Sequence, residues 1–431
     1  MSQKISDVVC PFCGCLCDDI VLRLEDGKII ENRNGCAISK AKFLNHLQDR
    51  LLTPTIRSAE GVHECDLDAA LEEATTILSE ACRPLIYGLS STENDAHREA
   101  YHIAELLGGV VDNTSSVCHG PSLLGVQESG EPHGALTEVR NRADLVIYWG
   151  CNPVHAHPRH ISRFVTAAGE FVREPRKERE IWVIDVRETA TSRLANHFIN
   201  VEIGSDLEVL SVLRSLVKQR RVDVSQVGGV RVSRLHEMAE RMKAARYGVL
   251  FYGLGLTQSR GRHRNVDAAI RLLQDLNEFG KWNIIPMRGH FNVAGANKTC
   301  TWTTGFPFSV DFSRGYPRYQ PGEYSAVDLL QRGEADVLMN IAADPCAHLP
   351  VDAVRSLKSI PIINLDPKRN LTSTIATVNI PTAQSGIESD GVAVRMDGLP
   401  LYLKKVTEPP VGVLPDRDIL RMIRERLEAG P

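Results

Sequence analysis

The chain has 431 residues, of which 43% are hydrophobic and 24% are charged, and its formal net charge is −4 at neutral pH. This length allows two or three domains with cores of their own, and the weakly acidic composition excludes the basic surface by which proteins bind nucleic acid or anionic membranes. No apolar run reaches the roughly 18 residues of a membrane span, and the N-terminus carries no secretory or twin-arginine signal. We therefore expect a cytoplasmic protein that works on small molecules and with other proteins.

The N-terminal segment is rich in cysteine. Four cysteines follow the spacing Cys10-x2-Cys13-x3-Cys17-x18-Cys36, and reducing conditions keep cytoplasmic thiols out of disulfides. Three thiolates from one tight loop and a fourth from a later turn suit a 4Fe-4S cluster, which takes four soft ligands. A structural zinc site is the alternative, although it more often uses two C-x2-C pairs. Cys15 is surplus to four ligands; we expect a packed thiol, and a register that uses it stays open.

Beyond residue 54, short β-branched runs alternate with amphipathic helical stretches. We expect strands at 83–89, 143–150, 180–186, 247–255, 335–342 and 360–366, and helices at 67–81, 206–219 and 264–279. This alternation predicts the α/β class, with parallel sheets covered by helices. Several strands end in Gly, Asn or Asp, and doubly wound sheets bind ligands beyond the carboxyl ends of their strands. The aromatic segment 300–325, rich in Gly and Pro, is interpreted as a long functional loop or a partner surface.

Two short motifs in the middle of the chain carry groups with suitable chemistry. Cys118 and His119 stand side by side in VCHGPS, and Arg288 precedes a glycine in MRGHF. Taken alone, each is weak, because an isolated Cys is usually a small buried hydrophobe and a lone His a satisfied core residue. An arginine fork can nevertheless hold a carboxylate with two hydrogen bonds.

Together with other segments in the same order, these motifs give the chain a family likeness. The segments are the cysteine loop, VCHGPS, YWGCNPVHAHPRH, VIDVRETATSRLA, VEIGSDLEVL, FYGLGLTQ, PMRGHFNVAG, NIAADPCAHLP and INLDPKRNLTSTIATVNIP. In this order, over nearly the whole chain, they resemble the molybdopterin oxidoreductase superfamily, and within it the formate dehydrogenases and the tungsten- or molybdenum-containing catalytic subunits of formylmethanofuran dehydrogenases. FYGLGLTQ has Gln258 where a dinucleotide fingerprint for NAD would place its third glycine, so a nicotinamide cofactor is not expected.

The resemblance implies a redox centre with three groups from the chain. Cys118 would ligate tungsten or molybdenum, His119 would handle protons beside it, and Arg288 would orient formate or carbon dioxide. These roles agree with the softness of a thiolate, the near-neutral titration of an ordinary histidine and the permanent charge of arginine. Which metal is bound, and whether Cys118 stays bound during turnover, are left open by the sequence.

The resemblance also implies two molybdopterin guanine dinucleotides, held at strand ends. The residues for the first are Gly150, Asn152, Gly253 and Gly255, which would approach through backbone, and Asp185 and Asp206, which would accept hydrogen bonds from guanine. The candidates for the second are Asn340, Asp344 and Asp366. For Asp185 and Asp206, a helix N-cap or a strand-end turn is the alternative interpretation.

The implied fold has three parts. A small iron-sulfur domain would occupy residues 1–54, and two doubly wound α/β domains, related by approximate internal symmetry, would follow. One of them, 114–288, would be inserted in the other, formed by 55–113 with 289–431. The metal would then sit between these two domains, with Cys118 and Arg288 brought together.

Two departures from the superfamily pattern bear on partners. Many relatives carry a lysine two residues after the fourth cluster cysteine, whereas this chain has Ile38 there and Lys40 nearby, so the residue between cluster and pterin is uncertain. The C-terminal barrel domain of full-length formate dehydrogenases is also missing. We expect a small subunit to supply it, together with iron-sulfur electron-transfer subunits and an amidohydrolase-type subunit.

The function implied is the reduction of carbon dioxide to formate, which passes to the amidohydrolase-type partner and condenses with methanofuran, as in methanogenesis. Three alternatives remain: a stand-alone formate dehydrogenase, a cofactor-free structural subunit of a formyltransferase/hydrolase complex, and a superfamily enzyme for another oxyanion. The short H-x-H of His155 and His157 lies in a dinucleotide segment and is not expected to form an amidohydrolase metal site.

Overall fold

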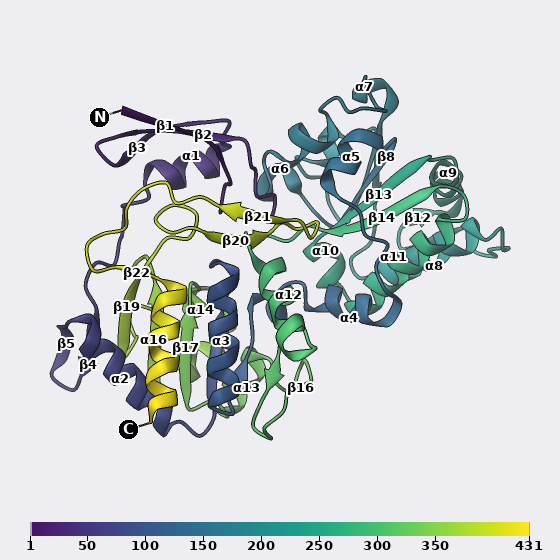
Figure 1. Cartoon of the computed structure of the whole chain (residues 1–431). Helices are drawn as coiled ribbons and strands as arrows, with labels where there is room; N and C mark the ends of the chain where they lie inside the picture. The colour runs from purple at the N-terminus through teal and green to yellow at the C-terminus, as the bar shows by residue number, and fades with distance from the viewer. Residues whose placement is uncertain (1, 431) are drawn as a thin grey trace. The chain divides into compact units, whose positions relative to one another are not determined.

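Parallel strands with helices on both sides make up most of the chain, which a computed structural model describes for residues 2–430 (Figure 1). The chain forms two units. Unit 1 comprises the residues up to 117, residues 290–395 and the residues from 400 onward, and unit 2 comprises Cys118–Gly289 with Met396–Leu399. The α/β class predicted from the sequence is confirmed, whereas the predicted domain boundaries, including the one at residue 54, stay predictions.

Unit 2 is built around five parallel strands in the order β10-β9-β8-β13-β14. The strands are β8 (Leu145–Trp149), β9 (Glu180–Asp185), β10 (His197–Asn200), β13 (Tyr247–Tyr252) and β14 (Lys281–Pro286). From β8 the chain runs outward through β9 to β10 and then returns to the other side of β8 for β13 and β14. The order therefore reverses between β8 and β13, and such switch points are where doubly wound sheets bind ligands.

Burial on both faces explains why these strands read as continuous apolar runs. In β8, Leu145, Ile147 and Trp149 pack in one core cluster with the apolar faces of the long helices, while Tyr148 is buried on the opposite face. These helices are α8 (Asp206–Val217), α9 (Val232–Lys243) and α11 (His263–Leu276). The shorter segments are α4 (Gly120–Ser129), α5 (Leu136–Arg142), α6 (Pro153–Ala156), η2 (Ile161–Val165), α7 (Pro175–Glu178), η3 (Ser192–Leu194), β11 (Gln226–Val227), β12 (Val230–Arg231) and α10 (Leu254–Thr257).

One predicted strand ends earlier than expected. The run 247–255 forms a strand only to Tyr252, because the chain turns at Gly253 into the short helix α10. A glycine that precedes a helical turn ends the strand here and leaves the following residues at the carboxyl edge of the sheet.

Unit 1 contains the larger sheet, in the order β16-β15-β7-β6-β17-β18-β19-β4-β5. Its strands are β4 (Thr55–Ser58), β5 (Gly61–Glu64), β6 (Pro84–Gly88), β7 (Val110–Val111), β15 (Val310–Asp311), β16 (Arg318–Tyr319), β17 (Val337–Ile341), β18 (Ile362–Asp366) and β19 (Val378–Ala383), and β22 (Leu414–Pro415) pairs with β19. The central strands β7, β6, β17, β18 and β19 are parallel. The chain order reverses between β6 and β17, which gives unit 1 a switch point of its own.

Helices cover both faces of this sheet. Ile86 of β6 packs with α2 (Leu67–Glu80), α3 (Asn94–Leu106), α12 (Val293–Thr304) and α16 (Asp416–Ala429), while its neighbours Leu85 and Tyr87 pack with α13 (Ala326–Arg332) and α15 (Val351–Leu357). This alternation follows from the two-residue period of a strand. Helices α3 and α16 lie side by side over one face (Figure 1). The remaining segments are η1 (Thr114–Val117), α14 (Pro345–His348), β20 (Gly391–Val394) and β21 (Pro400–Leu403).

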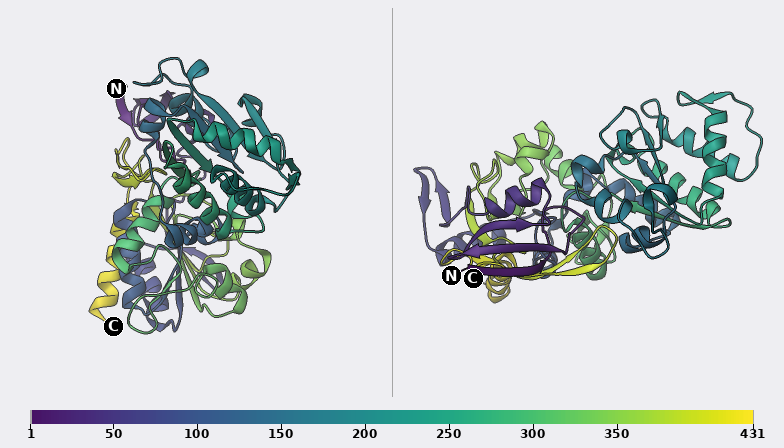
Figure 2. Two further views of the ribbon diagram at one scale, coloured as in Figure 1. Left: turned by 90° about the vertical axis from the view of Figure 1, so that its right-hand side faces the viewer. Right: turned by 90° about the horizontal axis from the view of Figure 1, so that it is seen from above.

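The N-terminal module of unit 1 carries the cysteine loop. Three antiparallel strands, β1 (Ser2–Val8), β2 (Ile20–Glu25) and β3 (Lys28–Arg33), lie side by side, as the right-hand view of Figure 2 shows, and α1 (Ala37–Leu44) follows them. The Cys36 thiol caps α1, since its Sγ accepts a hydrogen bond from the Ser39 amide at 3.4 Å. No described helix is both long and apolar enough to cross a membrane.

The aromatic segment 300–325 differs in part from the predicted loop. Its first residues form the last turn of α12, and β15 adds to the edge of the large sheet, where Phe308 and Phe312 are buried. These aromatic side chains belong to the core, which the Gly and Pro content of the segment concealed. Trp302 and Tyr316 are exposed, so the partner surface stays a prediction for them.

Candidate functional site

The four predicted cluster cysteines lie in one loop and at the start of α1. Cys10 and Cys17 are buried, and Cys13 and Cys36 are partly exposed. The loop is closed by a hydrogen bond from the Cys10 amide to the Cys17 carbonyl at 2.8 Å. Burial raises the pKa of Cys10, and Cys13, Cys17 and Cys36 raise this pKa further. All four thiols are therefore close enough to interact electrostatically, which fits ligands gathered around one cluster.

Cys15 is only 1% exposed, as expected of a packed thiol. Within residues 2–430, no three His, Cys, Asp or Glu side chains are arranged to hold a metal ion. A 4Fe-4S cluster differs from a single ion in that each thiolate binds a different iron. The tight loop with a fourth thiol on the next helix fits that arrangement.

Lys42, rather than Lys40, extends from α1 toward a cavity of unit 1. Its Nζ lies 5.3 Å from the centroid of the Phe12 ring, and both residues line the cavity. The pKa of Cys13 is lowered by hydrogen bonding with Cys15 and also by the charge of Lys42. Lys42 follows Ile38, the position at which relatives carry lysine, by one helical turn, and so it lies on the same face of α1. Lys42 was not predicted from the sequence, although helical periodicity points to it.

The cavity has a volume of about 460 Å³ and lies at the carboxyl ends of β17, β18 and β19. Asp344 and Asp366, predicted for the second dinucleotide, both line it. Burial raises the pKa of Asp366 to about 8. A hydrogen bond of 2.8 Å from the Lys368 amide to its Oδ1 lowers this pKa in part. An acid in this environment can change its protonation state when a ligand with hydrogen-bond donors enters.

Asp344 is held by its own loop. Its Oδ1 accepts hydrogen bonds from the Thr372 amide at 3.0 Å and the Thr372 hydroxyl at 2.7 Å, and its Oδ2 accepts one from the Leu371 amide at 3.1 Å. Asn340 is not among the residues that line the cavity. Its amide nitrogen donates to the Ala343 carbonyl and to Asn364, each at 2.7 Å. Its Oδ1 is buried without a partner, and its part in binding the second dinucleotide stays a prediction.

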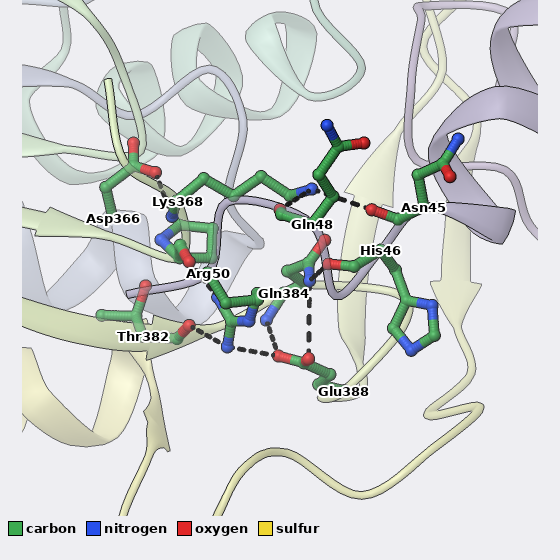
Figure 3. A network of polar contacts seen from close by, with 10 residues as sticks. Asn45, His46, Gln48, Arg50, Asp366, Lys368, Thr382, Gln384 and Glu388 are labelled. Atoms are coloured by element: carbon green, nitrogen blue, oxygen red, sulfur yellow. Dashed lines mark hydrogen bonds and ion pairs between the residues drawn. The ribbon is translucent and has the colours of Figure 1, made fainter. Parts of the chain in front are cut away.

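A buried ion pair ties the N-terminal module to the same strand ends (Figure 3). Arg50 pairs with Glu388 at 2.8 Å, and the side chains are 3% and 0% exposed. Arg50 also donates to the carbonyls of Pro367 and Thr382. Lys368 donates to the carbonyls of Asn45 and Gln48 at 3.2 and 2.9 Å. These bonds fix the end of the cluster module beside the cavity.

In unit 2, the three predicted glycines meet at the switch point. Gly150 has a φ of +57°, and a Cβ added to it would lie 2.7 Å from the Gly255 carbonyl carbon. A Cβ on Gly253 would lie 2.6 Å from the Cys151 Cβ. The Gly255 amide donates to the Gly150 carbonyl at 2.9 Å. The glycines therefore allow the loops after β8 and β13 to pack against each other. This packing requires glycine whether or not a cofactor binds beside the loops.

The polar residues predicted for the first dinucleotide surround these loops. Asn152 accepts a hydrogen bond from the Thr191 hydroxyl at 2.7 Å. Asp185 ends β9, accepts from the Val186 amide at 2.8 Å, and has a pKa raised by burial. Asp206 accepts from the Trp149 indole at 2.8 Å, while its other carboxylate oxygen is buried without a partner. A buried acceptor left open in this way fits a ligand that donates hydrogen bonds, such as guanine.

Cys118 and His119 at the start of unit 2 and Arg288 near the end of its main segment interact electrostatically, although about 170 residues separate them along the chain. Burial raises the pKa of Cys118 to about 11, and the nearby positive charge of Arg288 lowers this pKa in part. The Cys118 carbonyl accepts from the Thr257 hydroxyl at 3.2 Å and the Gln258 amide at 2.9 Å. These bonds anchor the Cys118 main chain to the loop after β13.

His119 is buried close to the charge of Arg288. Burial and, to a smaller extent, the charge of Arg288 lower its pKa to about 3, so the ring is neutral at neutral pH. Its Nδ1 lies 3.0 Å from the Ser122 hydroxyl, and a hydrogen bond to the Met287 main chain acts in the opposite direction on the pKa. Full burial beside a cation is not evident from the sequence around His119, and its predicted part in proton handling stays a prediction.

Thr191 and Thr372, whose hydroxyls donate to Asn152 and Asp344, were not predicted from the sequence either. Both lie in Ser/Thr-containing segments directly after a strand, which is a weak signal for such a role.

Comparison with known proteins gives strong relatives, although no family model matches the chain. The chain is 48% identical to one subunit of the tungsten-containing formylmethanofuran dehydrogenase 2 of Methanocaldococcus jannaschii, over 99% of both chains. It is 43% identical to the subunit of the same name from Methanococcus maripaludis, again over 99% of both chains. Among solved structures, a chain of the formyltransferase/hydrolase complex of Methylorubrum extorquens has the same fold, with a TM-score of 0.70 and 23% identity over 87% of this chain and 99% of that chain.

Proposed function

The chain belongs to a family of formylmethanofuran dehydrogenase subunits, which are oxidoreductases, and from this membership we propose that it is the subunit on which carbon dioxide is reduced to formate. The observation that carries the proposal is the convergence of Cys118, His119 and Arg288 in a chain that matches tungsten-containing relatives from end to end. A fold alone would not support it, because one fold hosts many chemistries.

The cofactors are part of the proposal. Cys10, Cys13, Cys17 and Cys36 would hold a 4Fe-4S cluster, and Cys118 would bind tungsten or molybdenum. Two molybdopterin guanine dinucleotides would sit at the two switch points, against the glycine loops of unit 2 and in the cavity of unit 1. When bound, the metal-pterin centre supplies two-electron redox chemistry. The open oxygen of Asp206 and the raised pKa of Asp366 support a ligand with hydrogen-bond donors at each place.

The chain's own residues would act on the substrate as follows. Carbon dioxide plus two electrons and one proton gives formate. Arg288 would hold the two oxygens as negative charge develops on them, since a guanidinium matches a carboxylate with two parallel hydrogen bonds. His119 would stand beside it as the group that handles the proton. Electrons would enter from iron-sulfur partner subunits through the cluster, with Lys42 between cluster and cavity.

Formate would then leave for a partner. We propose that it passes to an amidohydrolase-type subunit for condensation with methanofuran, and that a small subunit covers the cofactors. The same interpretation places the protein in the cytoplasm, in carbon dioxide reduction by methanogenesis.

The alternatives are not favoured. A stand-alone formate dehydrogenase fits less well, because the relatives at 48 and 43% identity are named as formylmethanofuran dehydrogenase subunits and match in full length. A cofactor-free structural subunit would have no need of the four cluster cysteines with Cys118, all of which this chain retains.

Arg288→Lys tests the proposal in the intact complex, purified without oxygen. Lysine keeps the charge but lacks the planar fork, so kcat/KM for formate oxidation should fall by about a hundredfold or more. Arg260→Lys, at an exposed position of unit 2, is the matched control and should change little. A nearly normal rate for Arg288→Lys would point to a superfamily enzyme for another oxyanion.

A further inference from the structure

His157 lies next to the main chain of Arg288 and has no part in the function proposed so far. Its Nε2 is 2.8 Å from the Arg288 carbonyl oxygen, and the residue is 2% exposed. A carbonyl can only accept a hydrogen bond, so Nε2 carries the proton and donates it. The other ring nitrogen of His157, Nδ1, is buried without a partner. The ring therefore makes one hydrogen bond, and that bond goes to Arg288.

The main chain of His157 is held by hydrogen bonds in the loop after β8. Its amide donates to the Pro153 carbonyl at 2.8 Å, which closes the short helix α6 after β8. The Thr191 hydroxyl accepts from the Val154 amide at 3.3 Å and holds the start of the same helix. The ring thus extends from the loop after β8, past β13, to the loop after β14.

Main-chain hydrogen bonds and a second histidine also hold the segment that carries Arg288. The Met287 amide donates to the Tyr252 carbonyl at 2.8 Å, and the Arg288 amide donates to the Pro286 carbonyl at 3.0 Å within a tight turn. His119 is hydrogen-bonded to the Met287 main chain. Two histidines, from different loops, therefore hold two consecutive residues. Gly289, which follows, is exposed and has no neighbour within 4 Å of an added Cβ.

We propose that His157 is a positioning residue for Arg288: its imidazole fixes the main chain from which the guanidinium reaches the carboxylate of formate. The role of the guanidinium rests on the proposed function, while the support of the main chain does not. A buried neutral ring is suited to this task, because a donor that makes a single hydrogen bond in a dry site holds its acceptor without adding charge beside the substrate.

The test compares His157→Phe, which removes the donor, with His157→Gln, which keeps an N–H donor on a side chain of similar reach. His155→Phe, an exposed histidine of α6, is the matched control. The first measurement is amide hydrogen exchange of residues 287–292 in the intact complex. Exchange should become faster in His157→Phe, and remain normal in His157→Gln and His155→Phe.

The second measurement is formate-dependent reduction of a viologen dye by the same complexes. The KM for formate should rise about tenfold in His157→Phe, the change expected when a hydrogen bond worth about 1.4 kcal/mol is lost, with partial rescue in His157→Gln. Normal exchange and KM in His157→Phe, or equal losses in the Phe and Gln variants, would overturn the inference. A wild-type complex that does not oxidise formate would overturn the proposed function, and the exchange data would still decide whether His157 holds the segment.

Discussion

At the carboxyl edge of each sheet, loop residues after two neighbouring strands form a small hydrogen-bonded site, here called a corner. The two corners have the same backbone conformation but differ in charge. The unit 2 corner consists of Gly150, Asn152, Asp185 and Thr191, and the unit 1 corner consists of Ala342, Asp344, Asp366 and Thr372. The residue that starts the short helix has φ −124° and ψ 75° at Asn152, and φ −123° and ψ 74° at Asp344. In each corner a threonine hydroxyl donates to this residue at 2.7 Å.

The corners differ in what the shared backbone holds. Asn152 is neutral, whereas Asp344 is a carboxyl group with three hydrogen bonds from residues 371 and 372. Asp185 is half-buried, whereas Asp366 is buried with a pKa of about 8. Equivalent glycine and alanine stand in the left-handed region, with φ +57° at Gly150 and +50° at Ala342. The hydrogen-bonded frame is therefore common to both corners, while the electrostatic environment offered to a ligand is not.

The largest difference should appear at the left-handed position. In Gly150→Ala, the new Cβ would meet the Gly255 main chain at 2.7 Å, and φ is unfavourable, so we expect unit 2 to lose about 3 kcal/mol of unfolding free energy. Ala342→Gly should change unit 1 by less than about 1 kcal/mol, because relief of strain and the greater entropy of the unfolded chain oppose each other. Denaturant unfolding followed by the fluorescence of the buried Trp149, Trp182 and Trp282 reports on unit 2, and hydrogen exchange of β17 reports on unit 1. Equal losses in both variants would show that the two positions are not different in packing.

The threonine hydroxyls should differ next. In Thr372→Val, the Asp344 carboxyl group loses a hydrogen bond and the Cys346 amide loses its acceptor, so local opening should become easier by about 3 kcal/mol. In Thr191→Val, the neutral Asn152 loses the equivalent bond and the Val154 amide loses its acceptor, so about 2 kcal/mol is expected. Amide exchange at Cys346 and Val154 measures both. A larger effect at Thr191 would contradict the claim that charge separates the corners.

The last expected difference between the corners is a pH dependence at Asp366. Its folded pKa of about 8 lies above the ordinary value of about 3.9, so the group's contribution to stability is full below pH 4 and is lost as the pH rises toward 8. Asp366→Asn removes this loss. In the absence of nucleotide, the unfolding free energy of the variant minus that of the wild-type chain should therefore increase by on the order of 2 kcal/mol between pH 4 and pH 8. Asp185→Asn, at the half-buried position of the other corner, should show the same direction and a smaller change. Thermal unfolding across this pH range is the measurement, and a flat difference for Asp366→Asn would refute the raised pKa.

Much of this arrangement was predictable from local sequence patterns. The apolar runs of β6, β8, β9, β17 and β18 fall where period and β-branched content place strands, and the strand-end glycines Gly150, Gly253 and Gly255 do gather at one edge. The α/β class followed from the alternation alone.

What could not be predicted rests on contacts between distant residues. Thr191 lies 39 residues from Asn152, and Thr372 lies 28 residues from Asp344. The low pKa of His119 depends on its burial and on the charge of Arg288. Neither can be predicted from the residues next to His119 in the sequence. The short segment Met396–Leu399 belongs to unit 2 although its neighbours belong to unit 1. Each of these features is set by tertiary packing, which local propensity does not encode.

Each corner is proposed to bind a guanine dinucleotide, and the chain is proposed to hold a 4Fe-4S cluster and a heavy metal as well. Elemental and nucleotide analysis of the complex, purified anaerobically from its native host, tests this claim most directly. The account predicts about four irons, one tungsten or molybdenum and two guanylates per chain. An intact, active complex that lacks both the heavy metal and guanylate would contradict the account and leave the chain as a structural scaffold.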